Sequence, residues 1–382
     1  MKIERYLLSL LQDAITPGKV VVLYGPRQVG KTTLATELLD NTDLKVQLIN
    51  ADELRYREAL ASQDRQVLGN LLADNELLII DEAQRVENIG LNLKILVDQF
   101  PGAAIIATGS ASFELANKIS EPLTGRSLTY YMYPVSYGEI QQTFGPFEAR
   151  EQLDRWLIWG GYPEIAVEES TQRREQLLGE LVGSYLYRDL LELDGLRKPE
   201  KIVDLLRLLA FQIGQEVSLS ELATNLAINR ETVDRYLDLL EKVFVIFRVS
   251  GFSRNLRKEV TKNARYYFFD NGVRNALIQN FNPLHLRNDV GQLWENYLIM
   301  ERRKVNAASQ RKANIYFWRT YDQKEIDYIE EREGKLFGYE IKRQGEMKKK
   351  TRREFSQSYP HAELQTVTVD NFEAFLGDKE FD

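Results

Sequence analysis

The stretch that most constrains this chain is a glycine-rich loop between a strand and a helix. Residues 19–34 read KVVVLYGPRQVGKTTL, and the three valines and leucine at 20–23 predict a buried strand. Residues 25–32 then follow the pattern G-x-x-x-x-G-K-T, and residues 33–39 continue as an amphipathic helix. Strand, glycine loop and helix in this order are the context that a phosphate-binding loop requires.

The residue types in this loop suit phosphate. Gly25 and Gly30 allow backbone conformations and close approaches that a side chain would block. The loop amides and the helix N-terminus direct partial positive charge at phosphate oxygens. We expect Lys31 to reach the β- and γ-phosphates and the Thr32 hydroxyl to ligate Mg²⁺. The predicted nucleotide-binding residues are Gly25, Pro26, Arg27, Gln28, Val29, Gly30, Lys31, Thr32 and Thr33.

A second stretch supplies two carboxylates. Residues 76–85 read ELLIIDEAQR, a continuous apolar run that ends in Asp81 and Glu82, as expected of a buried parallel strand. We expect Asp81 to hold Mg²⁺ through water and Glu82 to orient or activate the attacking water. An acidic helix cap is the alternative, but the position 50 residues after Lys31 favours a Walker B motif.

These stretches resemble a known family. GPRQVGKTT, LLIIDEAQ, ATGSAS, LTGR and GGYPE (160–164) are similar to prokaryotic AAA-family ATPases with a long C-terminal region, and the resemblance extends over nearly the whole chain. It implies ATP and Mg²⁺ as cofactors, ATP hydrolysis, a helical lid and then a winged helix. The resemblance leaves the biological role open.

The resemblance to an AAA-type site predicts two further polar residues. A polar side chain at the tip of the strand 103–108 contacts the γ-phosphate or the water in such sites, and Thr108 or Ser110 can serve, with Ser110 preferred. Strand-end capping is the alternative. Arg126 lies in a loop before a further strand and can act as an arginine finger in its own or a neighbouring subunit. An intersubunit finger implies a homo-oligomer, and an ordinary surface arginine is the alternative.

Composition excludes several classes of protein. The chain has no cysteine and two histidines, which rules out thiolate metal sites and a histidine-rich zinc site. No apolar run approaches membrane-spanning length, and the charged N-terminus does not resemble a signal peptide, so we expect a cytoplasmic protein without a membrane partner. Residues 251–353 hold 23 Lys/Arg against 13 Asp/Glu, and the remainder holds 27 against 44. This asymmetry indicates an anionic partner for the basic part, or a solvated basic face.

Residues 217–252 predict a helix, a short turn, a second helix and a strand. Ser218 or Ser220 can cap the first helix, and Asn229 can cap the second. This is the order of a winged helix-turn-helix. The second helix mixes charges of both signs, so the basic segment after it is the better phosphate-contacting surface. Protein contacts are the alternative to DNA. The predicted DNA-binding residues are Arg254, Arg257, Lys258 and Lys262, and Arg265 belongs to the same predicted phosphate-contacting surface.

The last segment carries separate chemistry. Glu295 lies in a helix-like run, Asp327 in a strand, and Glu340 with Lys342 in an E-x-K on the next strand. Side chains alternate along a strand, so Glu340 and Lys342 face the same side. Two carboxylates with a lysine can hold Mg²⁺ and position a water against phosphate. The set resembles the PD-(D/E)XK nuclease fold, which also occurs in inactive binding modules. The basic run 348–353 is either a phosphate-contacting surface or a solvated helix face.

The sequence thus predicts an α/β protein with a parallel P-loop sheet. We expect an AAA-type ATPase core at 1–135, a helical lid at 136–198, a winged helix-turn-helix at 199–275 and a nuclease-like α/β domain at 276–382. The predicted function is Mg²⁺-dependent ATP hydrolysis coupled to DNA binding or processing. The alternative is an ATP-dependent switch or scaffold for protein partners, with an inactive nuclease-like domain.

Overall fold

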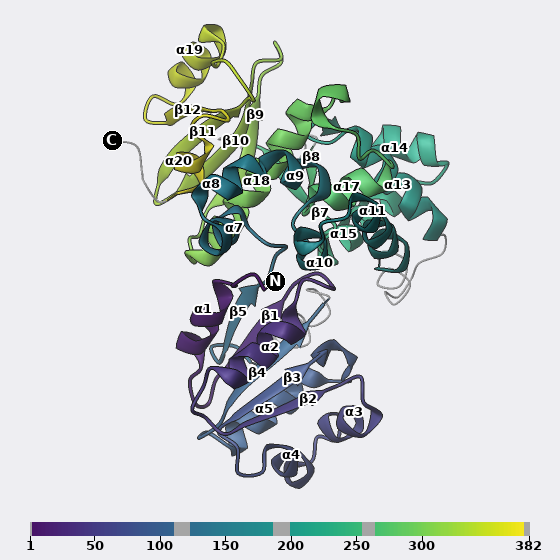
Figure 1. The fold of residues 1–382 in the computed structure, drawn as a ribbon, viewed down its shortest axis with the longest axis vertical. Helices are drawn as coiled ribbons and strands as arrows, with labels where there is room; N and C mark the ends of the chain where they lie inside the picture. The colour runs from purple at the N-terminus through teal and green to yellow at the C-terminus, as the bar shows by residue number, and fades with distance from the viewer. Residues whose placement is uncertain (1, 111–122, 186–198, 254–263, 378–382) are drawn as a thin grey trace. The chain divides into compact units, whose positions relative to one another are not determined.

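The computed structural model describes residues 2–110, 123–185, 199–253 and 264–377 (Figure 1). The chain divides into two compact units. Unit 1 is Met1–Val135 with Lys242–Phe244, and unit 2 is Ser136–Glu241 with Val245–Asp382. The predicted finer boundaries at 198/199 and 275/276 stay predictions.

Unit 1 is built on a parallel sheet of five strands in the order β2-β3-β4-β1-β5. Its three central strands are buried along their whole length, which agrees with the continuous apolar runs in their sequences. The parallel P-loop sheet that the sequence predicts is therefore present. The strands are β1 (Val20–Tyr24), β2 (Val46–Asn50), β3 (Leu77–Asp81), β4 (Ala104–Gly109) and β5 (Ser127–Tyr131).

Helices cover this sheet. Leu7 and Leu11 of α1 and Leu34 and Leu38 of α2 join alternate strand residues in one apolar core. These positions recur every three or four residues, which puts them on one face of each helix. The helical elements are α1 (Leu7–Ala14), α2 (Lys31–Asp40), α3 (Leu54–Leu60), α4 (Arg65–Leu72), the 3₁₀ turn η1 (Ala83–Arg85) and α5 (Ile89–Gln99).

Unit 2 begins with a run of helices. They are α7 (Tyr137–Phe144), α8 (Pro146–Glu151), α9 (Leu153–Trp159), α10 (Pro163–Val167), α11 (Thr171–Glu180), the π turn η2 (Leu181–Tyr185), α13 (Pro199–Phe211), α14 (Leu219–Leu226) and α15 (Arg230–Lys242). Ser218 caps α14, and the Asn229 side chain accepts a hydrogen bond from the Thr232 amide at 2.8 Å at the start of α15. The two helices between residues 217 and 242 and their caps were therefore predicted, while the winged helix-turn-helix stays a prediction.

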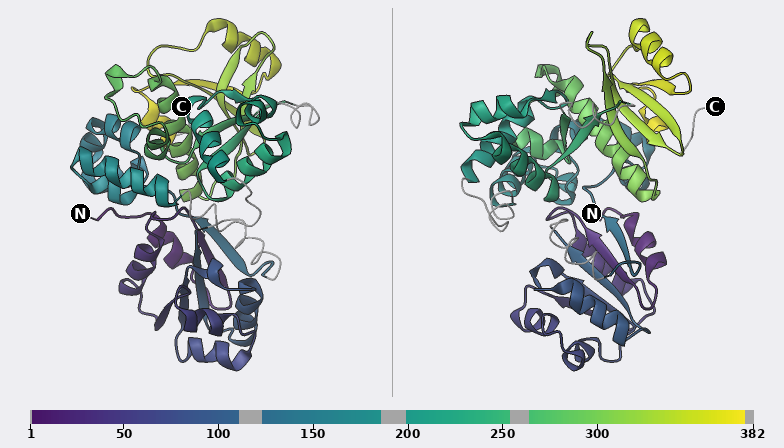
Figure 2. Two further views of the ribbon diagram at one scale, coloured as in Figure 1. Left: turned by 90° about the vertical axis from the view of Figure 1, so that its right-hand side faces the viewer. Right: turned by 180° about the vertical axis from the view of Figure 1, so that it is seen from behind.

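Within the described residues, the sheet of unit 2 has seven strands in the order β12-β11-β10-β9-β7-β8-β6. Figure 2 gives two further views of the ribbon, in which the C-terminal strands are coloured green to yellow. A parallel pairing of β7 with β9 joins Ser250 to Tyr316 and Gly251 to Phe317, so strands from the two predicted C-terminal domains form one sheet. The strands are β6 (Glu216–Val217), β7 (Ile246–Gly251), β8 (Ala264–Phe268), β9 (Asn314–Arg319), β10 (Glu325–Arg332), β11 (Lys335–Ile341) and β12 (Glu363–Val367).

The two faces of this sheet are covered by different helices. Tyr328 of β10 packs against Phe375, whereas the next residue, Ile329, joins a core with Phe355. Because neighbouring residues of a strand face opposite sides, α20 and α19 lie on opposite faces. The remaining helical elements are α17 (Asn271–Leu277), η3 (Leu284–Leu286), α18 (Val290–Ala308), α19 (Lys349–Ser358) and α20 (Phe372–Leu376).

Candidate functional site

The glycine loop of unit 1 runs from the end of β1 to the start of α2. A Cβ atom on Gly25 would lie 2.3 Å from the Met132 carbonyl oxygen, and Gly30 has φ +101°, so both positions need glycine. Lys31 is buried, and its Nζ donates to the carbonyl oxygens of Gly25 at 2.9 Å and Pro26 at 2.8 Å. The lysine thus lies along the concave side of the loop, where a phosphate chain would be held.

Arg5 supports the loop from outside. Its Nη1 donates to the Val29 carbonyl oxygen at 3.0 Å, and its Nη2 contacts the Tyr133 carbonyl oxygen. Sequence reasoning missed this residue, because its partners lie 24 and 128 residues away along the chain. Arg5 fixes the backbone of the loop rather than presenting a group to a ligand.

Thr32 and Asp81 meet at the carboxyl ends of β1 and β3. The Thr32 hydroxyl donates to Asp81 Oδ2 at 2.7 Å, and the Thr108 hydroxyl donates to Asp81 Oδ1. A hydroxyl and a carboxylate within hydrogen-bond distance are oxygen ligands that suit Mg²⁺. The two residues predicted to hold the metal ion therefore fit that ion, with Thr108 orienting the buried carboxylate.

The next residues along β3 and β4 form a second polar group. Glu82 has φ 55° and its amide donates to Thr108 Oγ1 at 3.3 Å. Gln84 Nε2 donates both to the Glu82 carboxylate and to Ser110 Oγ, the latter at 3.0 Å. Glu82 and Ser110 are therefore brought together, and Gln84 joins them. The sequence signal for Gln84 was its place in the run DEAQ.

Arg126 lies at the opposite edge of the sheet from the loop. It directly precedes β5, whose first residue pairs with Val20, while the glycine loop follows Tyr24 at the other end of β1. Five strand residues span roughly 16 Å. The Arg126 guanidinium is ion-paired with Asp98 of α5. From this position the arginine is directed away from the loop of its own chain.

The GGYPE stretch has a structural explanation. Gly160 has φ +73°, and a Cβ there would lie 2.0 Å from Asp270 Oδ1. The Gly161 amide donates to Asp270 Oδ2 at 2.7 Å, and the Val273 amide donates to Oδ1 at 3.1 Å. Burial raises the pKa of Asp270, although these amide donors oppose the rise. The glycines therefore let α9 approach the residue that caps α17.

Unit 2 brings together the carboxylates predicted from its last segment. Arg265 of β8 lies among them: its Nη1 is 3.6 Å from Glu295 Oε1 and 3.5 Å from Asp327 Oδ1. Its Nη2 donates to Glu325 Oε2 at 2.6 Å. We call Arg265, Glu295, Glu325, Asp327 and Glu340 the carboxylate cluster. The prediction that Arg265 contacts phosphate was wrong, because the side chain is buried among these acids.

Neutral donors and a lysine complete the cluster. The Tyr267 hydroxyl donates to Glu295 Oε1 at 2.6 Å, and the Ile341 amide donates to Asp327 Oδ2 at 2.9 Å. Lys342 Nζ lies 3.0 Å from Glu340 Oε1, so these two side chains do share a side of β11. A shift in the pairing of β10 with β9 between Ile326 and Ile329 forms a bulge around Asp327. Bulges of this kind redirect a side chain relative to strict alternation.

Electrostatics within the cluster are strongly perturbed. Burial raises the pKa of Glu295 to about 7, with Arg265 acting in the opposite direction. Burial, and then the neighbouring Glu295 and Glu340, raise the pKa of Asp327 well above its ordinary value. Burial works against the charged guanidinium, but Tyr267 and the surrounding acids outweigh it and raise the pKa of Arg265. The four acidic side chains of the cluster outnumber their two cationic neighbours, Arg265 and Lys342.

The donor set does not fit a divalent metal ion as it stands. Among the residues that the structure describes, no group of three or more histidine or acidic side chains is arranged to hold a metal. The guanidinium of Arg265 instead occupies the space between Glu295 and Asp327. We therefore derive no metal-dependent step for this cluster.

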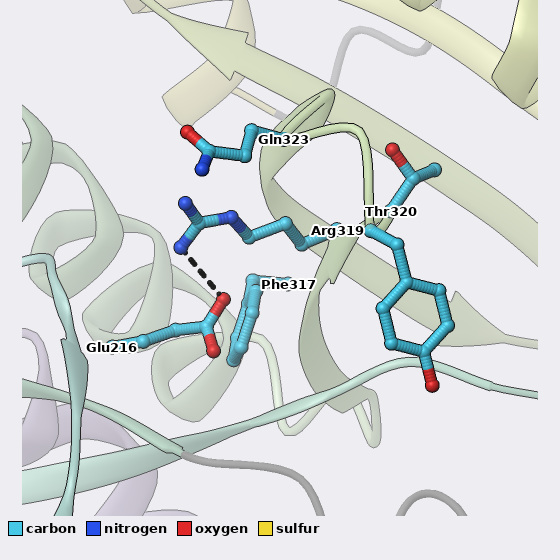
Figure 3. A pocket seen from close by; sticks show the side chains of 6 residues that line it. Glu216, Phe317, Arg319, Thr320 and Gln323 are labelled. Atoms are coloured by element: carbon cyan, nitrogen blue, oxygen red, sulfur yellow. Dashed lines mark hydrogen bonds and ion pairs between the residues drawn. The ribbon is translucent and has the colours of Figure 1, made fainter.

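A hollow of about 320 Å³ lies between β6 and the end of β9 (Figure 3). Arg319 reaches across it to Glu216, with Nη1 2.9 Å from Oε1. Phe317 forms part of its wall, and the Arg265 guanidinium lies 4.6 Å from the centre of that ring. Phe317 therefore contacts both the hollow and the guanidinium of the cluster. The lining residues are Glu216, Phe317, Arg319, Thr320, Tyr321 and Gln323.

The predicted DNA-binding residues Arg254, Arg257, Lys258 and Lys262 lie outside the described residues. The basic run in α19 is described, and Lys348, Lys349, Lys350, Arg352 and Arg353 are all exposed. None of these five makes an ion pair with another residue in the described ranges.

Comparison with known families identifies the first part of the chain. Residues 17–141 match the family described as AAA domain, a family of P-loop ATPases. This supports ATP binding by unit 1. Residues 150–284 and 290–377 match two families described as domains of unknown function, DUF8612 and DUF4143.

The relatives extend over most of the chain and are themselves uncharacterized. An uncharacterized protein of Mycobacterium tuberculosis is 28% identical over 356 residues, covering 90% of this chain and 75% of its own. One from Methanocaldococcus jannaschii is 24% identical over 339 residues, covering 84% and 74%. A solved STAND protein with a tetratricopeptide repeat sensor from Pyrococcus horikoshii is 14% identical, covers 81% of this chain and 48% of its own, and has a TM-score of 0.30. So low a score carries no argument about this chain.

No helix in the described ranges combines the length and the apolar character needed to cross a membrane.

Proposed function

We propose that unit 1 is a Mg²⁺-dependent ATPase that controls the binding of DNA by unit 2. The observation that carries the ATPase is the convergence of three groups at one sheet edge. Lys31 lies in the glycine loop, Thr32 is hydrogen-bonded to Asp81 at 2.7 Å, and Glu82 follows directly. Lys31 and the loop amides would bind the β- and γ-phosphates, and Thr32 and Asp81 would hold Mg²⁺. The ion would neutralise charge on the phosphates.

Glu82 is the proposed partner of the attacking water. Its carboxylate is held by Gln84, which also contacts Ser110, so the three side chains form a polar line beside the loop. A carboxylate fixed in this way can orient a water and accept its proton. Ser110 and Thr108 would respectively sense the γ-phosphate and orient Asp81.

Arg126 is proposed as an intersubunit residue. Its place at the sheet edge away from the loop is compatible with reaching a nucleotide held by a second copy of the chain, and its ion pair with Asp98 would then open. Assembly of the ATP-bound chain into a homo-oligomer is therefore part of the proposal.

ATP turnover tests this assignment. Lys31→Ala should lower the rate of ATP turnover by about 10²-fold or more, because the positive charge that Lys31 would place beside the phosphates is lost. Lys19→Ala is the matched control, since Lys19 lies at the other end of β1 and its Nζ donates to the Gly125 carbonyl oxygen at 2.7 Å. Equal rates for the two variants would refute the assignment.

DNA is the proposed partner of unit 2. The order α13, β6, α14, α15, β7, β8 is that of a winged helix, which supports this proposal. The exposed side of α15 mixes Arg230 and Arg235 with Glu231, Asp234 and Asp238, so it suits sequence reading poorly. The basic run of α19 supplies a better surface for the phosphate backbone. Its cations lie at the start of a helix that has no acidic residue in its first turn. The helix dipole disfavours positive charge there, so a bound anion would stabilise this end of the helix.

Charge reversal tests the DNA contact. Lys349→Glu with Arg352→Glu should weaken binding to a labelled duplex and flatten its salt dependence. Lys312→Glu with Lys335→Glu changes the net charge equally at other exposed positions of unit 2 and should have a smaller effect. Unchanged DNA binding by the variant with Lys349→Glu and Arg352→Glu would favour a different function, an ATP-dependent switch for protein partners. The position of the Arg265 guanidinium between Glu295 and Asp327, which were predicted to form a nuclease-like site, is the observation that supports that function.

A further inference from the structure

The carboxylate cluster of unit 2 raises a question that neither ATP hydrolysis nor DNA binding answers. Glu295, Asp327 and Glu340 have side chains that are only 14%, 11% and 11% exposed. A buried charged carboxylate is costly unless it is paired. Each of these side chains must therefore be protonated or paired with a cation.

Arg265 supplies that cation. Its side chain is 4% exposed, and its guanidinium lies within 3.6 Å of Glu295, Asp327 and Glu325. The pairing of β8 with β7 and β6 fixes its backbone, and Phe317 packs against the guanidinium at 4.6 Å. The aromatic ring contacts the face of the guanidinium and the carboxylates contact its edges, so the guanidinium is held in place.

The compensation is incomplete. Glu340 Oε2 is buried and has no hydrogen-bond partner among the residues that the structure describes, while Oε1 of the same carboxylate pairs with Lys342. An unsatisfied buried carboxylate oxygen beside Asp327 is an unused ligand position. The cluster therefore retains oxygen ligands for a cation that the guanidinium does not satisfy.

We propose that Arg265 is the resident cation of this cluster and takes the place of a divalent metal ion, so that unit 2 contains a latent metal site which opens only when Arg265 is removed. A guanidinium and a divalent ion cannot share the space between Glu295 and Asp327, because they would overlap and repel each other. With Arg265 absent, Glu295, Asp327 and Glu340 provide the hard oxygen ligands that Mg²⁺ or Mn²⁺ prefers. The wild-type cluster accordingly binds no divalent ion.

Mn²⁺ binding by the full-length chain tests the proposal, with stoichiometry read from the electron paramagnetic resonance signal of free Mn²⁺. All proteins carry Asp81→Asn and are free of nucleotide, which removes the site in unit 1. We expect no bound Mn²⁺ with Arg265 present, one equivalent in Arg265→Met, and none in Arg265→Met with Asp327→Asn. Arg265→Lys keeps the charge and should bind no Mn²⁺.

Thermal unfolding gives an independent readout. Arg265→Met should melt below the parent protein, because the carboxylates repel one another, and MnCl₂ should raise its melting temperature by several degrees. MnCl₂ should leave the parent unchanged. If Arg265→Met does not fold alone, recovery on refolding with MnCl₂ supports the proposal, and failure with and without Mn²⁺ counts against it.

Two results would overturn the inference. One is a Mn²⁺ ion bound with Arg265 present and lost in Asp327→Asn, since metal and arginine would then coexist. The other is a folded Arg265→Met protein that binds none, since the cluster would then be no latent site. Neither result bears on ATP turnover in unit 1.

Discussion

The two units treat buried carboxylates in opposite ways. In unit 1, Asp81 accepts hydrogen bonds from two neutral hydroxyls, those of Thr32 and Thr108, and the loop lysine rests on backbone carbonyls. In unit 2, Asp327 and Glu295 face the guanidinium of Arg265. Neutral donors orient a carboxylate without cancelling its charge, whereas a guanidinium cancels it. The same acidic residue types are therefore oriented by neutral donors in one unit and paired with a guanidinium in the other.

The largest effect is expected from breaking a buried ion pair in unit 2. Arg302 Nε and Nη2 bind the two oxygens of Glu330 at 3.0 and 2.9 Å, and Glu330 is fully buried. Arg302→Met should destabilise unit 2 by about 3 kcal/mol, because the buried carboxylate loses its bidentate partner and keeps Arg332, whose Nε is 3.4 Å from Oε2, as its charged neighbour. Denaturant unfolding measures this.

The matched control is Arg343→Met, which removes an exposed pair with Asp154 at 3.1 Å and should cost about 0–1 kcal/mol. Similar losses in the two variants would contradict the view that unit 2 depends on buried charge pairs.

In unit 1 the carboxylate that follows Asp81 should matter for chemistry and not for folding. Glu82→Gln should lower ATP turnover by about 10²-fold, since a general base is lost, while affinity for ATP stays near that of the wild type. Turnover under saturating ATP and equilibrium binding of a fluorescent analogue separate the two. A large loss of affinity would instead make Glu82 part of the binding site.

The close approach of Gly25 to Met132 predicts a smaller, local effect. Gly25→Ala puts a methyl group 2.3 Å from a backbone oxygen, so the loop must shift, at a cost of about 1–3 kcal/mol and with weaker nucleotide binding. Gly102→Ala, whose Cβ would have no neighbour within 4 Å, is the control. Normal nucleotide affinity in Gly25→Ala would mean that the loop is not held as the structure has it.

A modest pH effect is expected from unit 2. Burial raises the pKa of Glu241 from 4.5 to about 7, while Arg248 opposes the rise. The folded state thus favours the protonated carboxyl, so this contribution to stability is full below pH 4.5 and is lost as the pH rises to about 7. Glu241→Gln should remove this part of the dependence of the free energy of unfolding on pH, which denaturant unfolding measures across this pH range. Glu231→Gln, at an exposed position of the same helix, should leave the slope unchanged.

Local patterns allowed much of unit 1 to be predicted. The glycine loop, Asp81 and Glu82 lie directly after apolar runs, so strand ends and side-chain chemistry could be read together. Arg5 could not be found, because its contact with Val29 depends on how α1 packs beside the loop. Thr108 was only an alternative to Ser110, since spacing does not tell which hydroxyl reaches Asp81.

In unit 2 the hairpin carrying Asp327 and Glu340 and the helix carrying Glu295 were predicted, because each has a regular local pattern. The parallel pairing of β7 with β9 was not, since it joins segments more than 60 residues apart. That pairing places β8 in the same sheet, from which Arg265 reaches Asp327 across Phe317. The spacing of residues along the sequence therefore could not identify Arg265 as the cation of the cluster.

Counting bound Mn²⁺ in the wild-type full-length chain tests the contrast between the units most directly. With a non-hydrolysable ATP analogue, the account predicts one tightly bound ion, lost in Asp81→Asn and retained in Asp327→Asn. A second ion that depends on Asp327, or a single ion insensitive to Asp81→Asn, would contradict it.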